Sequence, residues 1–339
     1  MKGFSNIFGF WKAAALTACT FFCFSDLRAQ DPQFHHFYNN ALLYNPAYTG
    51  NTDFGRFSLG YRNQWPGVGK AFTSYTASYD HFMENVNSGI GFQIVHDKAG
   101  SGGLRFTNFN GLFSHQLRLS RKLGLMMGVK AGYVSRAVNA ADFVFADQII
   151  RDGAPTVESG INESVNYLDL GTGVVFYHME KFWLGLSFNH INQPNQSLMD
   201  GESILPIRSS VQAGWNFDVN KNFAGRTNAT LTLAALYKAQ QKWDQLDIGM
   251  YYKTSPLILG LWYRGVPIKD NEVKYPNQDA VIVMAGIEYK QFSFAYSYDI
   301  TISKLAGNTG GAHEISMIIE LNKSNRRSAR YYRIPCPKF

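Results

Sequence analysis

A regular alternation of apolar and polar residues constrains this chain more than any other feature. In residues 246–264, LDIGMYYKTSPLILGLWYR, two alternating runs flank a turn at Thr254-Ser255-Pro256. One set of alternate positions is continuously apolar, whereas the other mixes glycine, aromatic and charged residues. Because successive side chains of a strand point to opposite faces, this pattern predicts a β-hairpin with one apolar face. A soluble β-sandwich could contain the same hairpin, so the number of repeats and their connections must decide between the two.

The alternation recurs along most of the chain after Gly55. Fourteen segments are strand candidates: residues 56–65, 71–82, 89–97, 104–117, 122–137, 165–178, 181–191, 206–218, 226–239, 242–253, 256–265, 279–289, 291–301 and 312–321. Strands of soluble sheets have about 5 to 6 residues, whereas a tilted strand needs about 9 to 11 to cross a membrane. The candidates have the membrane length. In segment 104–117 the phenylalanines change phase, which predicts a β-bulge.

The connections between these candidates differ in length by parity. Those after even-numbered strands are mostly short, such as Met179-Glu180 and Thr254-Ser255, whereas several after odd-numbered strands are long, such as 138–164 and 192–205. Short periplasmic turns that alternate with longer outer loops, over an even number of strands, are typical of outer-membrane β-barrels. We therefore predict an all-β fold, a transmembrane antiparallel β-barrel of about fourteen strands over residues 55–321, with both termini in the periplasm.

The barrel model also assigns the charged residues of the strands. Outer faces hold leucine, isoleucine, valine and phenylalanine, and the lumen takes polar residues, namely Arg62, Gln93, Lys130, Asp169, Asp247, Arg264, Glu288, Asp299, Glu314 and Glu320. Both signs of charge are present, so we expect ion pairs inside. A fourteen-stranded lumen is wider than one that wall side chains alone can fill. Residues 30–50 and the loop 138–164 are the candidate fillers.

The N-terminus has the features of an export signal. Lys2 and Lys12 precede an apolar run over residues 13–24, and Ala29 is a small residue at a candidate cleavage position. We expect residues 1–29 to be the signal peptide, after which Cys336 is the one cysteine that remains. Residues 30–54 then form a hatch in the lumen or a strap beneath the barrel, and Asn45-Pro46-Ala47 is the motif that marks this segment. Its sequence leaves the two alternatives open.

The last segment, residues 322–339, is basic and contains no acidic residue. It is either a solvated end or a periplasmic arm that binds a partner. Arginine and tyrosine are enriched in protein interfaces, which makes the docking arm a hypothesis worth testing. Its candidate partner-binding residues are Arg326, Arg327, Arg330, Tyr331, Tyr332, Arg333 and Cys336. The net charge of +7 lies largely in this tail, so we do not interpret it as a nucleic-acid-binding surface.

No catalytic, cofactor or metal motif is apparent in the sequence. His35 and His36 are adjacent, so on an extended chain they point in opposite directions. Asp142, Asp147 and Asp152 lack the spacing of a calcium loop. We find no nucleophile elbow, phosphate-binding loop or Cys-x-x-Cys pair. The sequence therefore predicts a protein that is not an enzyme and that needs no cofactor.

Four motifs taken together resemble the PorP/SprF family of outer-membrane proteins of the Bacteroidota type IX secretion and gliding system. They are QDPQFHHFYNNALLYNPAYTG at the expected mature start, GYRNQWPGV, YYKTSPLILGLWYRGVP and the final CPKF. The resemblance covers essentially the whole mature chain. The residues that match the motifs are Asn45, Pro46, Ala47, Tyr263, Arg264, Gly265, Cys336 and Pro337. His35 and His36 stand where the family would have a small polar residue before an aromatic one.

The resemblance implies a non-enzymatic component that supports secretion or surface anchoring of a large adhesin. Its implied partners are outer-membrane lipids, the secreted adhesin through its C-terminal domain, and a periplasmic ring lipoprotein. The alternative is a diffusion channel for small solutes, like FadL or the porins, because Asn-Pro-Ala near the start is also similar to the hatch of FadL-type transporters. The basic tail argues against this alternative. The sequence names neither the cargo nor the stoichiometry.

Overall fold

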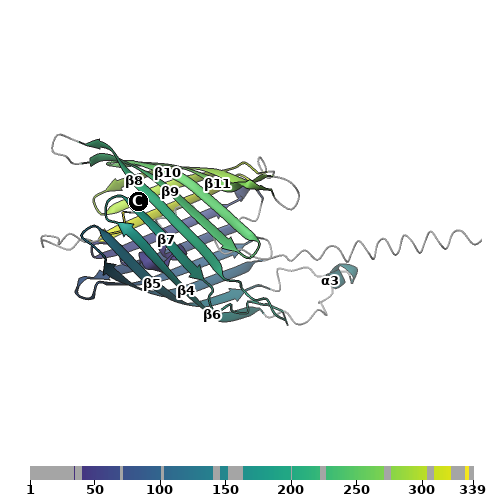
Figure 1. The fold of residues 1–339 in the computed structure, drawn as a ribbon. Coiled ribbons are helices and arrows are strands. Elements are labelled where there is room, and N and C mark those ends of the chain that lie inside the picture. The colour runs from purple at the N-terminus through teal and green to yellow at the C-terminus, as the bar shows by residue number, and fades with distance from the viewer. Residues whose placement is uncertain are drawn as a thin grey trace, which may run out of the picture. The chain divides into compact units, whose positions relative to one another are not determined.

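The strands predicted from the alternation form a closed antiparallel β-barrel (Figure 1). The computed structural model describes residues 34, 40–68, 72–100, 103–139, 146–151, 163–199, 201–221, 227–270, 276–303, 309–321 and 333–335, all within the unit Phe34–Phe339. The strands, in chain order, are β1 Gly55–Gln64, β2 Phe72–Met83, β3 Ser88–Ala99, β4 Leu104–Arg118, β5 Leu123–Ala137, β6 Ser164–His178, β7 Phe182–Asn189, β8 Arg208–Lys221, β9 Thr227–Gln240, β10 Trp243–Thr254, β11 Leu257–Asp270, β12 Pro276–Tyr289, β13 Phe292–Thr301 and β14 Ala312–Leu321.

Each strand pairs with its neighbours in sequence, and the first strand pairs with the last. β1 and β14 are in register from Gly55 opposite Leu321 to Gln64 opposite Ala312. This pairing closes the ring, so the edge strands hydrogen-bond to each other. A sheet in hydrocarbon must close in this way, because no water is available there to bind unpaired backbone groups.

The two faces of the strands separate as the alternation predicts. In the β10–β11 hairpin, Met250 and Leu261 are paired and exposed on the outer face. Tyr251 and Trp262 point inward and are buried, with their rings 5.3 Å apart. The exposed apolar face fits a lipid environment, because lipid tails surround a barrel of this kind on its outside.

The predicted bulge in segment 104–117 is wrong, because β4 pairs with β3 and β5 without a register shift. Phe109 and Phe113 are exposed on the outer face; Phe106, at the opposite parity, is the residue that broke the apolar pattern. The register shifts occur instead in the β8–β9 and β11–β12 pairs. At the second, Gly265 has φ 148°, a backbone conformation that favours glycine.

Two connections are shorter than predicted, because β8 continues to Lys221 and β11 continues to Asp270. The long connections 138–163 and 190–207 remain, and both lie at the same end of the barrel as the other connections after odd-numbered strands. The first of them contains the short helix α3, Ala146–Ile150. In the part of the chain that the structure describes, no helix has the length and apolar character to cross a membrane.

Candidate functional site

The N-terminal segment lies inside the barrel, where it packs against inward-facing side chains of the strands. We call residues 40–54 the hatch segment. It contains the helix α2, Ala41–Tyr44, and the 3-10 helix η1, Pro46–Tyr48, and the side chains of both are buried. These contacts with inward-facing residues support the hatch alternative for residues 40–54.

Asn45 joins the two short helices and explains the Asn-Pro-Ala motif. Its Oδ1 accepts a hydrogen bond from the Ala47 amide at 2.9 Å, which caps η1. Pro46 occupies the first position of η1, where its missing N–H leaves no bond unmade and its fixed φ suits the helix. The motif therefore shapes a tight reversal of the chain within the lumen.

The same Asn45 side chain binds the barrel wall. Its Nδ2 donates to Gln212 Oε1 on β8 at 3.0 Å, and lies 3.3–3.4 Å from the carbonyl oxygens of Leu186 on β7 and Val174 on β6. Asn45 is fully buried. One amide group thus fixes the hatch segment to three neighbouring strands.

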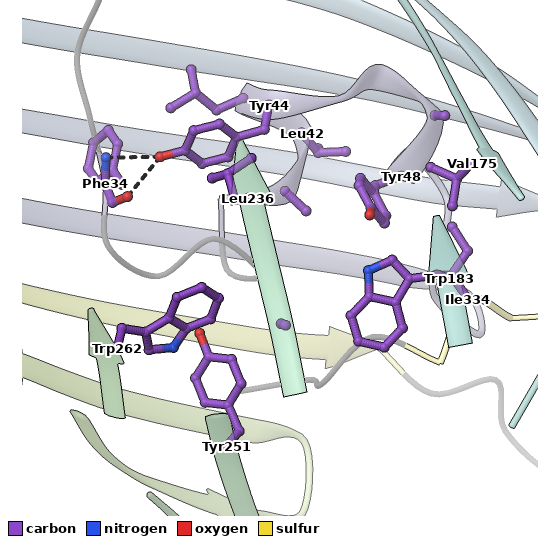
Figure 2. Close-up of a cluster of buried hydrophobic side chains, with 14 of the residues drawn as sticks. Phe34, Leu42, Tyr44, Tyr48, Val175, Trp183, Leu236, Tyr251, Trp262 and Ile334 are labelled. Carbon is purple, nitrogen blue, oxygen red and sulfur yellow. Dashed lines mark hydrogen bonds between the residues drawn. The ribbon is translucent and has the colours of Figure 1, made fainter. Parts of the chain in front are cut away.

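Tyr44 forms the second attachment, and Figure 2 shows its hydroxyl against the backbone of Phe34. Its hydroxyl donates to the Phe34 carbonyl at 2.7 Å and accepts from the Phe34 amide at 3.2 Å. Burial raises the pKa of Tyr44 to about 12, so the hydroxyl keeps the proton that it donates. Its carbonyl accepts from Ser187 Oγ at 2.7 Å, and Lys238 Nζ lies 5.5 Å from the ring centroid, a cation–π distance.

The third attachment is the end of the hatch segment, near the short β2–β3 turn. The Thr49 carbonyl accepts from Ser114 Oγ at 2.7 Å, and the Gly50 amide donates to Asp80 Oδ2 at 2.8 Å. Arg56 binds the same carboxylate through Nε and Nη2, at 2.9 and 3.1 Å. A buried ion pair therefore orients the acceptor for the hatch backbone.

Three inward-facing glycines, which the sequence analysis did not single out, make room for the hatch segment. A Cβ on Gly128 would lie 2.4 Å from the Ala47 nitrogen, one on Gly173 would lie 2.1 Å from Asn45 Oδ1, and one on Gly89 would lie 2.4 Å from the Thr49 carbonyl oxygen. Glycine within a strand often marks a close approach by another backbone. Glycine on the lumen-facing parity of neighbouring strands was thus the available signal for a hatch.

Five of the predicted lumenal charges and Lys238, which was not predicted, form a connected series along one part of the wall, from β9 to β1. Its contacts are Lys238–Asp247 at 3.9 Å, Arg264–Asp247 at 2.9 Å, Arg264–Asp299 at 3.7 Å, Arg62–Asp299 at 3.8 Å and Arg62–Glu314 at 3.6 Å. A separate group joins Lys130 to Asp169 at 3.0 Å and Asp169 to His190 at 2.7 Å. All of these side chains are buried. Glu288, nearer a turn, is partly exposed and pairs with Lys253.

The C-terminal tail is described only at residues 333–335, and these three contact the barrel. Ile334 is 2% exposed; its amide donates to Asn51 Oδ1 at 3.0 Å and its carbonyl oxygen lies 3.4 Å from Asn51 Nδ2. The Pro335 carbonyl accepts from Asn216 Nδ2 at 2.7 Å. Within this stretch an apolar residue that stands among basic ones is thus buried, with its backbone groups bonded.

The candidate partner-binding residues divide accordingly. Arg333 forms an ion pair with Asp53 of the hatch segment. The others, Arg326, Arg327, Arg330, Tyr331, Tyr332 and Cys336, lie outside the described residues, as do Pro337, His35, His36, Asp142 and Asp152. Across the described ranges, no three His, Cys, Asp or Glu side chains are grouped as a metal site would require.

Three solved structures match this chain at low sequence identity. Omp33 of Acinetobacter baumannii is 6% identical, with a TM-score of 0.44 over 78% of this chain and 98% of that chain. The CymD monoaromatic hydrocarbon channel is 11% identical, with a TM-score of 0.48 over 85% and 94%. A FadL homologue of Pseudomonas aeruginosa is 11% identical, with a TM-score of 0.42 over 78% and 90%. A comparison with curated protein sequences finds no match.

The family comparison covers the hatch segment and nearly all of the barrel. The model of the family described as type IX secretion system membrane protein PorP/SprF matches residues 27–319. This range contains the Asn45-Pro46-Ala47 reversal, the glycines that accommodate it and the lumenal ion pairs. The chain is therefore an outer-membrane β-barrel that belongs to the PorP/SprF family of type IX secretion system membrane proteins.

Proposed function

We propose that this protein is a non-enzymatic outer-membrane component of the type IX secretion and gliding system that supports secretion or surface anchoring of a large adhesin. Membership of the PorP/SprF family supports the secretion-system context. In this proposal residues 1–29 are the signal peptide, 30–54 the hatch, 55–321 the barrel and 322–339 the tail. Both termini lie in the periplasm, on the side of the short turns.

The observation that carries the proposal is the attachment of the hatch segment inside the lumen. Asn45, Tyr44 and Thr49 each bond to the wall, on β8, β7 and β4 respectively. A lumen segment held at three points favours a barrel that holds a partner in place over one that passes a steady flow of solute. A buried plug that is hydrogen-bonded to the wall also resists displacement, because removal would leave the bonded polar groups without these partners.

The proposed contact for the periplasmic partner is the part of the tail before Arg333. Arg326, Arg327 and Arg330 are three guanidinium groups within five residues, followed by Tyr331 and Tyr332. Guanidinium groups bind carboxylates bidentately and stack on aromatic rings. The tail therefore fits an acidic surface of a periplasmic ring lipoprotein, while the adhesin engages through its C-terminal domain.

The test combines partner capture with adhesin display in cells that produce the full-length protein. Replacement of Arg326, Arg327 and Arg330 by glutamine should abolish co-purification of the lipoprotein from detergent-solubilised membranes and reduce adhesin display. The capture by wild-type protein should weaken with added salt, since exposed charges are screened. The matched control replaces Arg118, Arg121 and Lys122, three exposed cations of the β4–β5 turn, by glutamine and should leave both readouts unchanged.

The same variants distinguish this proposal from its rivals. If both triple variants lose capture equally, general charge and not the tail attracts the partner. If neither variant affects display, the docking proposal fails. Planar-bilayer recording of the purified wild-type protein addresses the diffusion channel, which predicts steady conductance, whereas a bonded hatch predicts a closed barrel with rare openings.

A further inference from the structure

The contacts of residues 333–335 have the form of peptide recognition. Asn51 meets both backbone groups of Ile334, its Oδ1 accepting from the amide at 3.0 Å and its Nδ2 facing the carbonyl at 3.4 Å. A side-chain amide used in this way imitates the paired donor and acceptor of a neighbouring strand. Asn216, from β8, provides a second amide donor to Pro335 at 2.7 Å.

The side chain of Ile334 adds an apolar contact to these backbone hydrogen bonds. It belongs to the same buried apolar cluster as Trp183 and Tyr48, and Figure 2 shows Ile334 close to Trp183. Trp183 comes from the barrel wall and Tyr48 from the hatch segment. The isoleucine thus packs within a cluster to which both the wall and the hatch contribute.

We propose that the lumen holds a peptide-binding site for an extended Ile-Pro segment, that the chain's own Ile334-Pro335 occupies it, and that this occupation locks the hatch segment in place. The two tail residues that precede Pro335 each bind a hatch residue: Ile334 binds Asn51, and Arg333 pairs with Asp53. Thr52, between these two, is buried. The tail therefore closes over the end of the hatch, at the point where the chain passes from the lumen into β1.

On the proposed function, which this inference extends, the lock has a consequence for secretion. A partner that binds the tail through a longer stretch must withdraw Ile334 from the cluster. Withdrawal removes both amide contacts from Asn51 and the partner charge from Asp53. Docking of the tail would then loosen the end of the hatch, which links events in the periplasm to the state of the lumen.

Thr52 supplies a reporter for the lock in full-length protein purified in detergent. Its Oγ1 is buried and makes no hydrogen bond with the described residues, so Thr52→Cys exchanges one small side chain for another. In a Cys336→Ser background, a maleimide should label this cysteine slowly. The exposed reference Glu180→Cys, in the β6–β7 turn, sets the rate for an accessible thiol.

Ile334→Asp should release the tail and accelerate labelling of Thr52→Cys by roughly tenfold to hundredfold, the factor by which burial of one isoleucine shifts such an equilibrium. Ile334→Val is the matched control and should keep labelling slow. Asn216→Ala, which removes one contact to the tail outside the hatch, should give a smaller acceleration. Heat-dependent mobility in SDS gels verifies that each barrel is folded.

Two results would overturn the lock. Labelling of Thr52→Cys as fast as Glu180→Cys with the natural tail would mean that the site is not occupied. Equal, slow labelling with Ile334→Asp, Asn216→Ala and Ile334→Val would mean that the tail does not secure the hatch. No partner is present in this experiment, so its outcome is independent of the capture and display assays.

Discussion

Asn45 in the hatch segment and Gln212 on β8 are joined by a hydrogen bond of 3.0 Å between two buried side-chain amides. The bond spans 167 residues of sequence and ties the reversal of the hatch to the wall. Gln212 also donates through Nε2 to Ser210 Oγ at 3.0 Å. The wall therefore orients this side chain independently of the hatch segment. The hatch segment therefore binds to a site that the barrel wall preorganises.

Substitution of Asn45 should loosen the hatch in two separable steps. Asn45→Ala removes the cap of η1, which costs about 1 kcal/mol, and leaves Gln212 without its partner, which costs about 1–3 kcal/mol. Asn45→Ser retains a capping oxygen but cannot reach β8, so its effect should be intermediate. Urea unfolding of the protein in lipid measures stability, and bilayer recording counts openings. Equal effects of the two variants would show that the cap of η1 contributes nothing.

The space left by strand glycines gives a second test of the hatch. Gly128→Ala would place a Cβ 2.4–2.5 Å from backbone atoms of Pro46 and Ala47, which have no flexible end that can move aside. Gly111→Ala, on the adjacent β4, would meet its nearest neighbour only at 3.9 Å. We expect Gly128→Ala to increase channel openings and lower stability by about 1–3 kcal/mol, as overpacking does, with Gly111→Ala unchanged. If both variants behave like wild type, the hatch does not approach β5 this closely.

The loss of stability caused by a charged substitution on the outer face should depend on the depth of the residue in the membrane. Leu261 is 47% exposed and lies between the outward-facing Met250 and Val283 of the neighbouring strands. Leu261→Arg should destabilise the barrel by about 2–4 kcal/mol if it lies near the midplane, whereas Leu257→Arg, beside the turn, should cost about 0–1 kcal/mol. Folded yield and urea midpoints provide the comparison. A larger loss at Leu257 would contradict this placement of the membrane.

The strands were predictable because a membrane β-barrel imposes period-two alternation and a minimum strand length together. The ends of β8 and β11 were not, because a strand that continues beyond the bilayer no longer needs an apolar outer face. The choice between hatch and strap also could not be made from residues 30–50. Residues 40–50 are all buried, so their sequence shows no alternation of exposed and buried positions that would distinguish the two.

The burial of Ile334 could not be predicted from the composition of the tail. Six basic residues dominate residues 322–339 and suggest a solvated arm, yet one isoleucine and its two backbone groups fix the position of residues 333–335. The lumenal charges were predicted as a set because an acidic or basic residue on a barrel strand has only the lumen in which to lie. Their pairing was not predictable, since it depends on the register between strands.

Cysteine labelling of intact cells tests the proposed orientation. In a Cys336→Ser background, Glu202→Cys in the connection 190–207 should react with an impermeant maleimide, because long loops of outer-membrane barrels face outward. Glu180→Cys, in the short β6–β7 turn, should react only after the outer membrane is permeabilised. Both side chains are exposed in the structure, so folding does not hide either one. Labelling of Glu180→Cys alone on intact cells would reverse the topology.

The contribution of each lumenal ion pair to the stability of the barrel should depend on its burial and not on its distance. Lys253 and Glu288 are 2.6 Å apart but each is about a third exposed, whereas Arg264 and Asp247 are 2.9 Å apart and almost fully buried. Distance alone would make the first pair the stronger. Loss of one partner from a buried pair strands the other charge and costs about 3–5 kcal/mol, while an exposed pair contributes about 0–1 kcal/mol. Arg264→Met should therefore destabilise the barrel far more than Lys253→Met.

A double variant separates the cost of leaving one buried charge unpaired from the cost of losing the ion pair itself. Arg264→Met with Asp247→Asn removes both charges of the shortest contact. It should therefore recover part of the stability that Arg264→Met alone loses, since the carboxylate nearest to the lost guanidinium group is neutralised as well. Recovery should be incomplete, because Asp299 also lies 3.7 Å from Arg264 and loses this cation in both variants. Urea unfolding of the three variants beside wild type gives the ranking. If Lys253→Met proves as costly as Arg264→Met, then the lumen around Arg264 is hydrated enough to screen its charges, and the hatch does not keep water from that level of the barrel.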